Sequence, residues 1–245
     1  MESLESQYRT PKNGLFIFHR DLRITDNTGL IDALTTCENV YTAFVFTPEQ
    51  VTAQNKYKSK NCVQFMIESL VDLATELRKR GGQLICLYGN PVKMAKYLVQ
   101  TLNIDAVFYN KDYSPYAVER DNAVFDACVD LGVYCVDYPD YYLYEPGSVV
   151  TGSGSPYKKY TPFYDTVISK PVDSPSTLGQ IALKLTRLAK TSKSLDHTIT
   201  LEKAMRIYVG ILNEDILARG GRVNALIRFK QILRNQSHYA KERDF

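Results

Sequence analysis

The sequence lacks several features that define common classes of protein. Its 245 residues include no tryptophan, three histidines and five cysteines, and no two cysteines form a CxxC pair. The absence of CxxC and paired-histidine spacing excludes the common zinc sites, and the odd number of cysteines argues against a disulfide framework. We therefore expect no metal site, and an intracellular location, cytoplasmic or nuclear, where thiols stay reduced.

Long apolar stretches are missing as well. Apolar runs such as residues 15–18 are far shorter than the roughly 20 residues that span a bilayer. Residues 1–13 are polar and contain no apolar signal core. We expect no membrane partner, and we expect residues 1–13 to form a flexible N-terminus.

The usual phosphate-binding motifs do not occur. No GxGxxG follows the first apolar run, and the chain contains neither GxxxxGKS nor GxxxxGKT, so ordinary dinucleotide and nucleoside triphosphate sites are not expected. With three histidines, a histidine-based catalytic triad has few candidates. His19 follows an apolar run and is predicted to pack there rather than to catalyse.

The distribution of charge is uneven along the chain. Residues 1–170 carry 17 Lys and Arg against 20 Asp and Glu, a net charge of −3, whereas residues 171–245 carry 13 against 7, a net charge of +6. The basic excess of the last third could approach nucleic acid, or it could be an ordinary solvated surface. Charge alone leaves both interpretations open.

A regular alternation of two patterns runs through the first 140 residues. Short runs rich in β-branched and aromatic residues alternate with segments whose apolar residues recur at helical spacing. This order predicts an α/β fold, a Rossmann-like five-stranded parallel sheet with helices on both faces, which binds ligands beyond the carboxyl ends of its strands. The expected strands are residues 15–18, 40–46, 83–88, 106–109 and 133–136.

Capping residues mark where the intervening helices begin. Asp26 is predicted to cap the first helix and Ser59 the second, because both side chains can accept hydrogen bonds from free N–H groups of a first turn. Pro91 and Pro115 are predicted to open the next two helices, since the missing N–H of proline is harmless there.

The alternation ends near residue 138. We expect the α/β domain to cover residues 14–170, and residues 171–199, rich in Ser, Thr and Lys, to form a linker. Thr200 precedes a new helical pattern. Residues 200–245 are therefore predicted to form a C-terminal helical segment.

Two polar segments are candidate functional sites. The first follows the first predicted strand and contains Arg20, Asp21, Arg23, Asp26 and Asn27. Its arginines could bind carboxylates or phosphates, or the group could form an ion-pair latch that fixes a loop or a domain contact. The spacing favours the latch.

The second polar segment begins at Tyr157 and Lys158 and is both aromatic and basic. Such a segment could stack on and neutralise nucleic acid. It could equally pack between two domains, which is the interpretation we favour.

Several motifs resemble those of the cryptochrome/DNA photolyase family. Residues 15–27 resemble the opening strand of that family and its RDLRxxDN signature. Residues 61–70, 112–121 and 156–164 resemble three further family segments in the same order, and residues 220–245 resemble the entry to the helical, flavin-binding domain. The chain is therefore identified as a class I-type member, covering the amino-terminal part of the family.

The resemblance implies a role in light-driven DNA repair. In this family, a reduced FAD in the helical domain donates an electron to a pyrimidine dimer flipped out of the duplex, and the α/β domain holds an antenna chromophore, a folate or a deazaflavin. By position, Tyr239 would contact FAD and Asn110 the antenna. Ser114 stands where folate-binding bacterial members have glutamate, so a deazaflavin or an empty cleft is expected rather than folate.

The family's loop for the flavin phosphates and its electron-relay tryptophans have no counterpart in this sequence. We therefore expect this chain alone to bind no FAD and to be inactive. Three hypotheses stay open: a truncated or split photolyase-like enzyme completed by a second polypeptide with the rest of the FAD-binding domain, a stand-alone chromophore- or nucleotide-binding module, or a nonfunctional remnant. DNA binding through the basic last third is a weaker expectation.

The last two predicted helices carry apolar residues that in the intact family pack within the helical domain. Here they either pack back on the α/β domain or form an exposed patch. The residues concerned are Leu201, Met205, Ile211, Leu226, Phe229 and Ile232.

Overall fold

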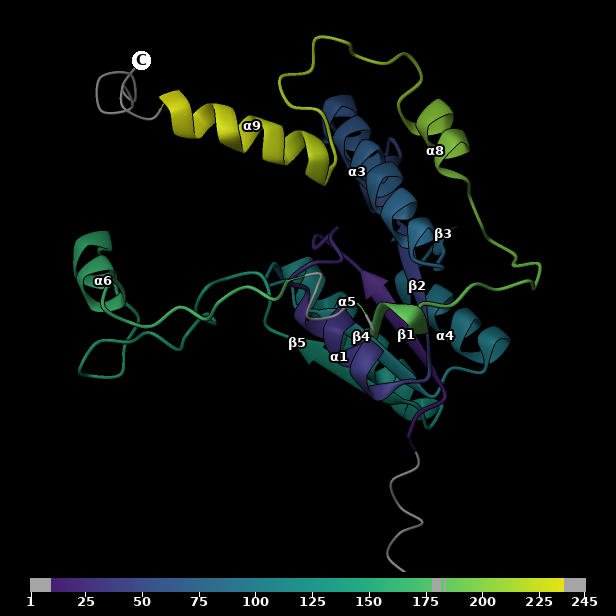
Figure 1. Ribbon diagram of the computed structural model, residues 1–245, viewed down its shortest axis with the longest axis horizontal. Coiled ribbons are helices and arrows are strands. Elements are labelled where there is room, and N and C mark those ends of the chain that lie inside the picture. The colour runs from purple at the N-terminus through teal and green to yellow at the C-terminus, as the bar shows by residue number, and fades with distance from the viewer. Residues whose placement is uncertain (1–9, 178–181, 183, 236–245) are drawn as a thin grey trace, which may run out of the picture.

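The computed structural model describes residues 10–177, 182 and 184–235 of the chain. Its strands form one parallel sheet in the order β3-β2-β1-β4-β5 (Figure 1). The predicted five-stranded α/β fold is therefore confirmed. The strands are β1 (Asn13–Phe18), β2 (Asn39–Phe46), β3 (Leu84–Tyr88), β4 (Ala106–Asn110) and β5 (Tyr134–Tyr138).

Helices connect the strands and continue beyond the sheet. Within the first part of the chain they are α1 (Thr28–Thr36), α2 (Pro48–Val51), α3 (Lys60–Lys79), α4 (Pro91–Leu102) and α5 (Pro115–Asp130). After β5 follow α6 (Tyr160–Val167), the short 3-10 helix η2 (Lys184–Arg187), α8 (Leu201–Tyr208) and α9 (Arg222–Asn235).

Apolar side chains of the central strands point alternately to the two faces of the sheet, because successive side chains of a strand lie on opposite faces. Phe16 and Phe18 of β1 pack in the core covered by α1 and α3, while Leu15 and Ile17 pack in the core covered by α4 and α5. All four are 6% exposed or less. The near-continuous apolar runs of the sequence are thus explained by burial on both faces.

Three of the four helices for which the sequence predicts a first residue or cap begin as predicted, and one does not. The Ser59 side chain accepts from Cys62 N, and Pro91 and Pro115 occupy the first turns of α4 and α5, as predicted. The prediction that Asp26 caps α1 is wrong. Asn27 is the cap, its Oδ1 accepting from Leu30 N at 3.1 Å, because Asp26 adopts a left-handed conformation with φ of 53° that turns the chain into the helix.

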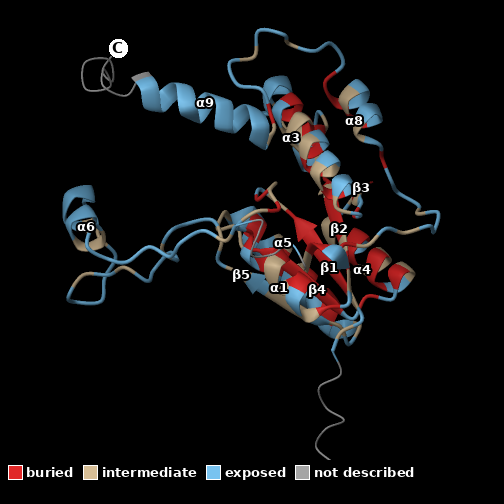
Figure 2. Ribbon diagram, viewed as in Figure 1, coloured by how far each residue is buried: buried red, intermediate tan, exposed pale blue. Residues whose placement is uncertain are grey.

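The last two helices behave differently from each other. Helix α8 packs against α3, where Leu201 and Met205 lie on the apolar core and Tyr208 is 9% exposed. Helix α9 extends away from the sheet, and its apolar side chains are between 47% and 59% exposed (Figure 2). The two outcomes that the sequence left open, packing back and exposure, are each realised in one helix.

The first turn of α9 is held on α3 by backbone groups. Gly220 N donates to Glu68 Oε2 at 2.7 Å, Gly221 N to Ser69 Oγ at 3.0 Å, and Arg222 N to Asp72 Oδ2 at 2.7 Å. A Cβ on Gly220 would lie 2.2 Å from the carbonyl oxygen of Phe65, so only glycine allows this approach.

The segment between η2 and α8, expected to be part of a linker, touches the sheet at two places. Ala189 N donates to Val40 O at 2.8 Å, and Ile199 N donates to Cys86 O at 3.0 Å. At the other end of the domain, Lys12 N and Asn13 N both donate to Asp105 Oδ2, so the chain is already fixed two residues inside the predicted flexible N-terminus. Residues 1–9 lie outside the described part, and the predicted domain boundaries stay predictions.

Within the described ranges, no helix combines the length and the apolar character that crossing a bilayer requires.

Candidate functional site

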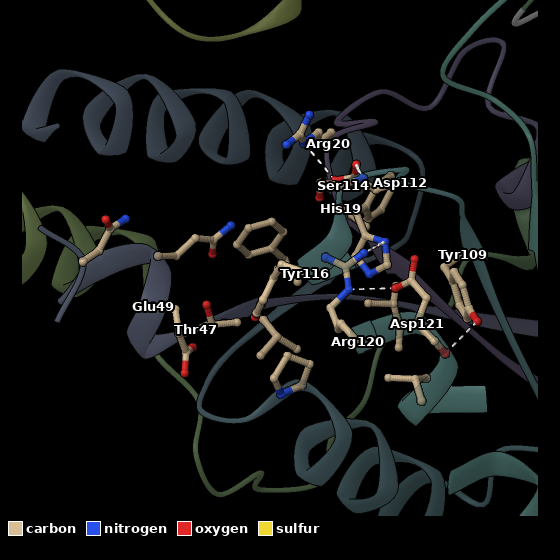
Figure 3. A pocket seen from close by; sticks show the side chains of 18 residues that line it. His19, Arg20, Thr47, Glu49, Tyr109, Asp112, Ser114, Tyr116, Arg120 and Asp121 are labelled. Atoms are coloured by element: carbon tan, nitrogen blue, oxygen red, sulfur yellow. Dashed lines mark hydrogen bonds and ion pairs between the residues drawn. The ribbon is translucent and has the colours of Figure 1, made fainter. Parts of the chain in front are cut away.

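The sheet has one point at which the strand order reverses direction. The chain builds β1, β2 and β3 toward one edge and then returns to place β4 on the other side of β1. Ligands of such sheets bind beyond the carboxyl ends of the strands on either side of this switch point. A cavity of about 330 Å³ opens there, lined by residues at or just after the ends of β1, β2 and β4 (Figure 3).

Aromatic and aliphatic groups make up much of the cavity wall. Phe18 and Phe44 come from the sheet, Tyr116 and Val124 from α5, and Pro91 from the start of α4. The polar lining residues labelled in Figure 3 are His19, Arg20, Thr47, Glu49, Tyr109, Asp112, Ser114, Arg120 and Asp121. An apolar slot with a few fixed polar groups is the usual form of a small-molecule site.

His19 belongs to a cluster of side chains on one wall of the cavity. Its ring is 5.6 Å from that of Tyr109, centroid to centroid, and its Nδ1 is 3.0 Å from an N–H group of Arg120. The same Nδ1 lies 3.3 Å from the carbonyl oxygen of Asn110, so it stands between a donor on α5 and an acceptor at the end of β4. Desolvation of the ring and the adjacent Arg120 charge lower the pKa of His19 to about 3.

The two arginines along the cavity form ion pairs, and Glu49 adds a further carboxylate to the lining. Arg120 Nε lies 2.7 Å from Asp121 Oδ1, and Arg20 Nε lies 3.0 Å from Asp112 Oδ2. Burial raises the pKa of Asp121, and the neighbouring Arg120 opposes that effect. Both cavity guanidiniums therefore have a carboxylate partner, so the site suits an uncharged planar group better than a free phosphate.

Behind the cavity, a buried polar network joins β1, α1 and β4. Asn110 Nδ2 donates to Asp21 Oδ2 at 2.6 Å and to Asn27 Oδ1 at 2.8 Å, and its Oδ1 accepts from Gly29 N at 3.0 Å. Asp21 also accepts from His19 N and from Asn27 Nδ2, both at 2.9 Å. The three side chains are 8% exposed or less.

Asp140, which follows β5, closes the network from the other side. Its Oδ2 lies 2.7 Å from Arg23, and its Oδ1 accepts from Thr28 N at 3.0 Å and from Thr28 Oγ1 at 2.8 Å. The Asp140 side chain is 5% exposed, so this ion pair is largely shielded from water. The RDLRxxDN segment thus fastens the loop after β1 to the ends of β4 and β5.

Within the predicted latch, Arg23 donates to the carbonyl oxygen of Asp26 from Nε at 3.1 Å and from Nη2 at 2.6 Å, but the ion pairs of its arginines lie outside the segment. Arg20 and Arg23 pair with carboxylates from distant segments, and Asp26 Oδ1 accepts from Ser176 N at 2.8 Å. Sequence reasoning missed these distant carboxylates and Arg120. Their positions in the sequence could have identified them, because Asp112 and Asp140 follow the ends of β4 and β5 and Arg120 lies on the helix after β4.

The other predicted site residues have separate places. Asn110 does not belong to the cavity lining and uses its amide inside the network, so its predicted antenna contact stays a prediction. Tyr157 Oη lies 2.8 Å from Thr166 Oγ1, which ties the preceding turn to α6, while Lys158 is exposed. Tyr239 lies outside the described residues.

The fold and the cavity together define a doubly wound α/β domain with a cavity for a small molecule at its switch point. The family model described as DNA photolyase matches residues 15–177, and the chain belongs to this family. The resemblance seen in the sequence is thereby confirmed.

The chain is similar both to proteins named photolyase and to proteins named cryptochrome. A deoxyribodipyrimidine photo-lyase of Synechococcus sp. is 30% identical over 161 residues, covering 66% of this chain and 33% of that protein. Cryptochrome-1 of Aedes aegypti is 35% identical over 168 residues, covering 65% of this chain and 30% of that protein. The chain thus matches about a third of the length of these curated relatives.

A solved structure shows the same similarity. The photolyase from Sulfolobus tokodaii, described as containing two FAD molecules and as implying a novel light-harvesting cofactor, matches with a TM-score of 0.71 and 32% identity. The match covers 88% of this chain and 45% of that protein.

The network centred on Asp21 predicts a costly substitution. In Asp21→Asn, an amide NH₂ must face either the His19 N–H or the two donors that now reach Oδ2. We expect a loss of about 1–3 kcal/mol in the free energy of unfolding, the cost of unpaired buried donors. Urea denaturation checks it, with the exposed Asp130→Asn as control, expected within about 0.5 kcal/mol of wild type. Equal effects of the two changes would contradict the network.

The lowered pKa of His19 predicts a pH dependence of stability. The ring is neutral when folded down to about pH 3, whereas the unfolded ring takes up a proton near its ordinary value of 6.5. Its contribution is therefore fully present above pH 6.5 and is lost as the pH falls toward 3, at about 1.4 kcal/mol per unit. The difference in unfolding free energy between wild type and His19→Gln should shrink over this window, and a constant difference would exclude the assignment.

Proposed function

We propose that this chain is the light-collecting, amino-terminal part of a photolyase-like protein related to light-dependent repair of pyrimidine dimers. The observation that carries the proposal is the cavity at the β1–β4 switch point, in a chain of this family. The related Sulfolobus photolyase, whose description names two FAD molecules and a light-harvesting cofactor, supports a second chromophore besides the reactive flavin.

The cavity residues fit the ring system of an antenna chromophore. Tyr116, which is 48% exposed, offers aromatic surface to a flat ring, and the pairing of both cavity arginines with carboxylates favours an uncharged one. The neutral His19 and Thr47 supply polar groups for the edge of such a ring. A bound antenna would supply light absorption and energy transfer, and these residues would hold and orient it.

A deazaflavin ring suits the cavity better than a folate. Ser114 lines the cavity at the position where the resemblance predicts a glutamate in folate-binding members. Serine cannot provide the carboxylate that such members carry there. We therefore assign the cavity to a deazaflavin ring.

The reactive FAD needs more than the described elements offer. Helix α9 projects from its anchored first turn, and its apolar side chains face water instead of enclosing a cofactor. We propose that a second polypeptide carrying the rest of the helical domain covers α9 and the exposed residues of α6, and that the chain alone binds no FAD and is inactive. Figure 1 shows both helices standing away from the sheet, toward the same side in that view.

A stand-alone chromophore-binding module is the second candidate, because the cavity is complete within the described α/β domain. A nonfunctional remnant would keep neither a defined cavity ligand nor a partner. Helix α9 carries Arg222, Arg228, Lys230 and Arg234 without an acidic residue, which supports a contribution to DNA binding in the assembled protein. An intracellular location is proposed with this role.

The cavity assignment predicts selective binding. The purified chain should bind 5-deazariboflavin and should not bind methenyltetrahydrofolate. Gln50→Phe adds bulk to the cavity wall and should weaken deazaflavin binding about tenfold or more, since overpacking costs about 1–3 kcal/mol. Fluorescence titration measures it, with Gln54→Phe, an exposed position outside the lining, as control. Preferential folate binding, or an unaffected Gln50→Phe, would overturn the assignment.

The partner proposal predicts reconstitution. Co-expression with a polypeptide carrying the carboxyl-terminal helical region of the Synechococcus photolyase should give a complex with FAD absorbance. Leu226→Glu with Phe229→Glu should abolish the complex, because two carboxylates would enter an apolar interface, while Gln231→Glu on the same helix should leave it intact. Copurification measured by gel filtration checks it. Stoichiometric FAD on the chain alone, or no complex, would contradict it.

A further inference from the structure

The outer edge of the sheet is formed by β3. Tyr88 N donates outward to His197 O, and Cys86 O accepts from Ile199 N, both at 3.0 Å, while Gly89 N donates inward to Phe46 O. In a parallel ladder, the backbone groups of alternate residues point to the same side. Leu84, Cys86 and Tyr88 therefore direct their N–H and C=O groups outward.

Part of this edge has no partner strand. Residues 188–189 contact β2 before β3 begins, and residues 197–199 cover the end of β3, but the chain between them swings away from the sheet (Figure 1). Over the described part of the chain, neither the N–H nor the C=O of Leu84 has a hydrogen-bond partner, and the N–H of Cys86 has none. Three successive outward-facing backbone groups of β3 are thus free to pair with another strand.

A groove of about 770 Å³ lies along the open stretch. Its floor and walls include Leu84, Ile85 and Cys86 of β3, Val71 of α3, and the returning residues Ile199 and Leu201. Its charged lining residues are Arg78, Lys190, Lys193 and Glu202. Among the residues that the structure describes, Arg78 and Lys190 form no ion pair, and the three basic residues of the lining outnumber its one carboxylate.

We propose that this groove binds an extended, acidic peptide segment of a partner protein, which adds a short strand to the free edge of β3. Main-chain hydrogen bonds to Leu84 and Cys86 would hold the segment, the apolar floor would receive alternate side chains, and Arg78 and Lys190 would pair with its carboxylates. This site is separate from the cavity at the switch point and independent of the proposed function.

A nucleic acid strand fits this groove less well. The floor presents the carbonyl oxygen of Leu84 as well as N–H groups, and this oxygen repels phosphate. A β-strand uses donors and acceptors alike. Alternating backbone groups at strand spacing therefore favour a peptide.

The test uses the full chain, isotopically labelled, and a short synthetic peptide of alternating Glu and Val. The amide signals of Leu84 and Cys86 should shift on titration, and their hydrogen exchange should slow. Arg78→Glu with Lys190→Glu should weaken binding about tenfold or more, since two favourable charge pairs become repulsive. Lys203→Glu with Arg206→Glu, an equal change of charge on exposed residues of α8 outside the groove, should not.

Two further probes separate the possible outcomes. A Glu-Val peptide methylated on its backbone nitrogens should lose binding, because strand addition depends on those N–H groups. A Lys-Val peptide should bind at least tenfold more weakly than the Glu-Val peptide. No shift at Leu84 and Cys86, retained binding of the methylated peptide, equal binding of the Lys-Val peptide, or displacement of the peptide by a single-stranded oligonucleotide would each overturn the proposal.

Discussion

The hydrogen bonds between Asn110, Asp21 and Asn27 hold together the part of the molecule on which its chemistry depends. They join the ends of β1 and β4, the two strands between which the sheet reverses direction, to the first turn of α1. The same loop carries His19 and Arg20 into the cavity. The shape of the cavity therefore depends on a polar cluster that lies behind the cavity wall. Conservation of this cluster would preserve the binding site even though none of its side chains lines the cavity.

Much of the fold could be predicted because it follows from local pattern. The apolar runs of β1 and β4 and the caps at Ser59 and Pro91 act within a few residues, and the parallel order follows from the alternation. The cap of α1 could not be assigned in the same way. Asp26 and Asn27 are both good caps, and the choice between them depends on the backbone turn at Asp26, which tertiary contacts stabilise.

The candidate site was less accessible to sequence reasoning. The polar residues after β1 were correctly singled out, but the pairing of Arg23 with Asp140, 117 positions away, depends on the order of the strands. Likewise, Arg120 contacts His19 across 101 positions because α5 returns beside β1 and β4. Spacing along the chain cannot identify such contacts. Both α8 and α9 carry apolar residues, but only α8 packs them against the core beside α3.

The attachment of α9 has an implication for how this chain can diverge. Its orientation is set by main-chain amides of residues 220–222 and by acceptors on α3, not by the side chains along the helix. Nearly every residue of α9 could therefore be substituted during evolution without changing the direction of the helix. The exposed side chains of α9 can thus change together with those of a binding partner. Gly220 and the three acceptor side chains of α3 cannot change without loss of the attachment.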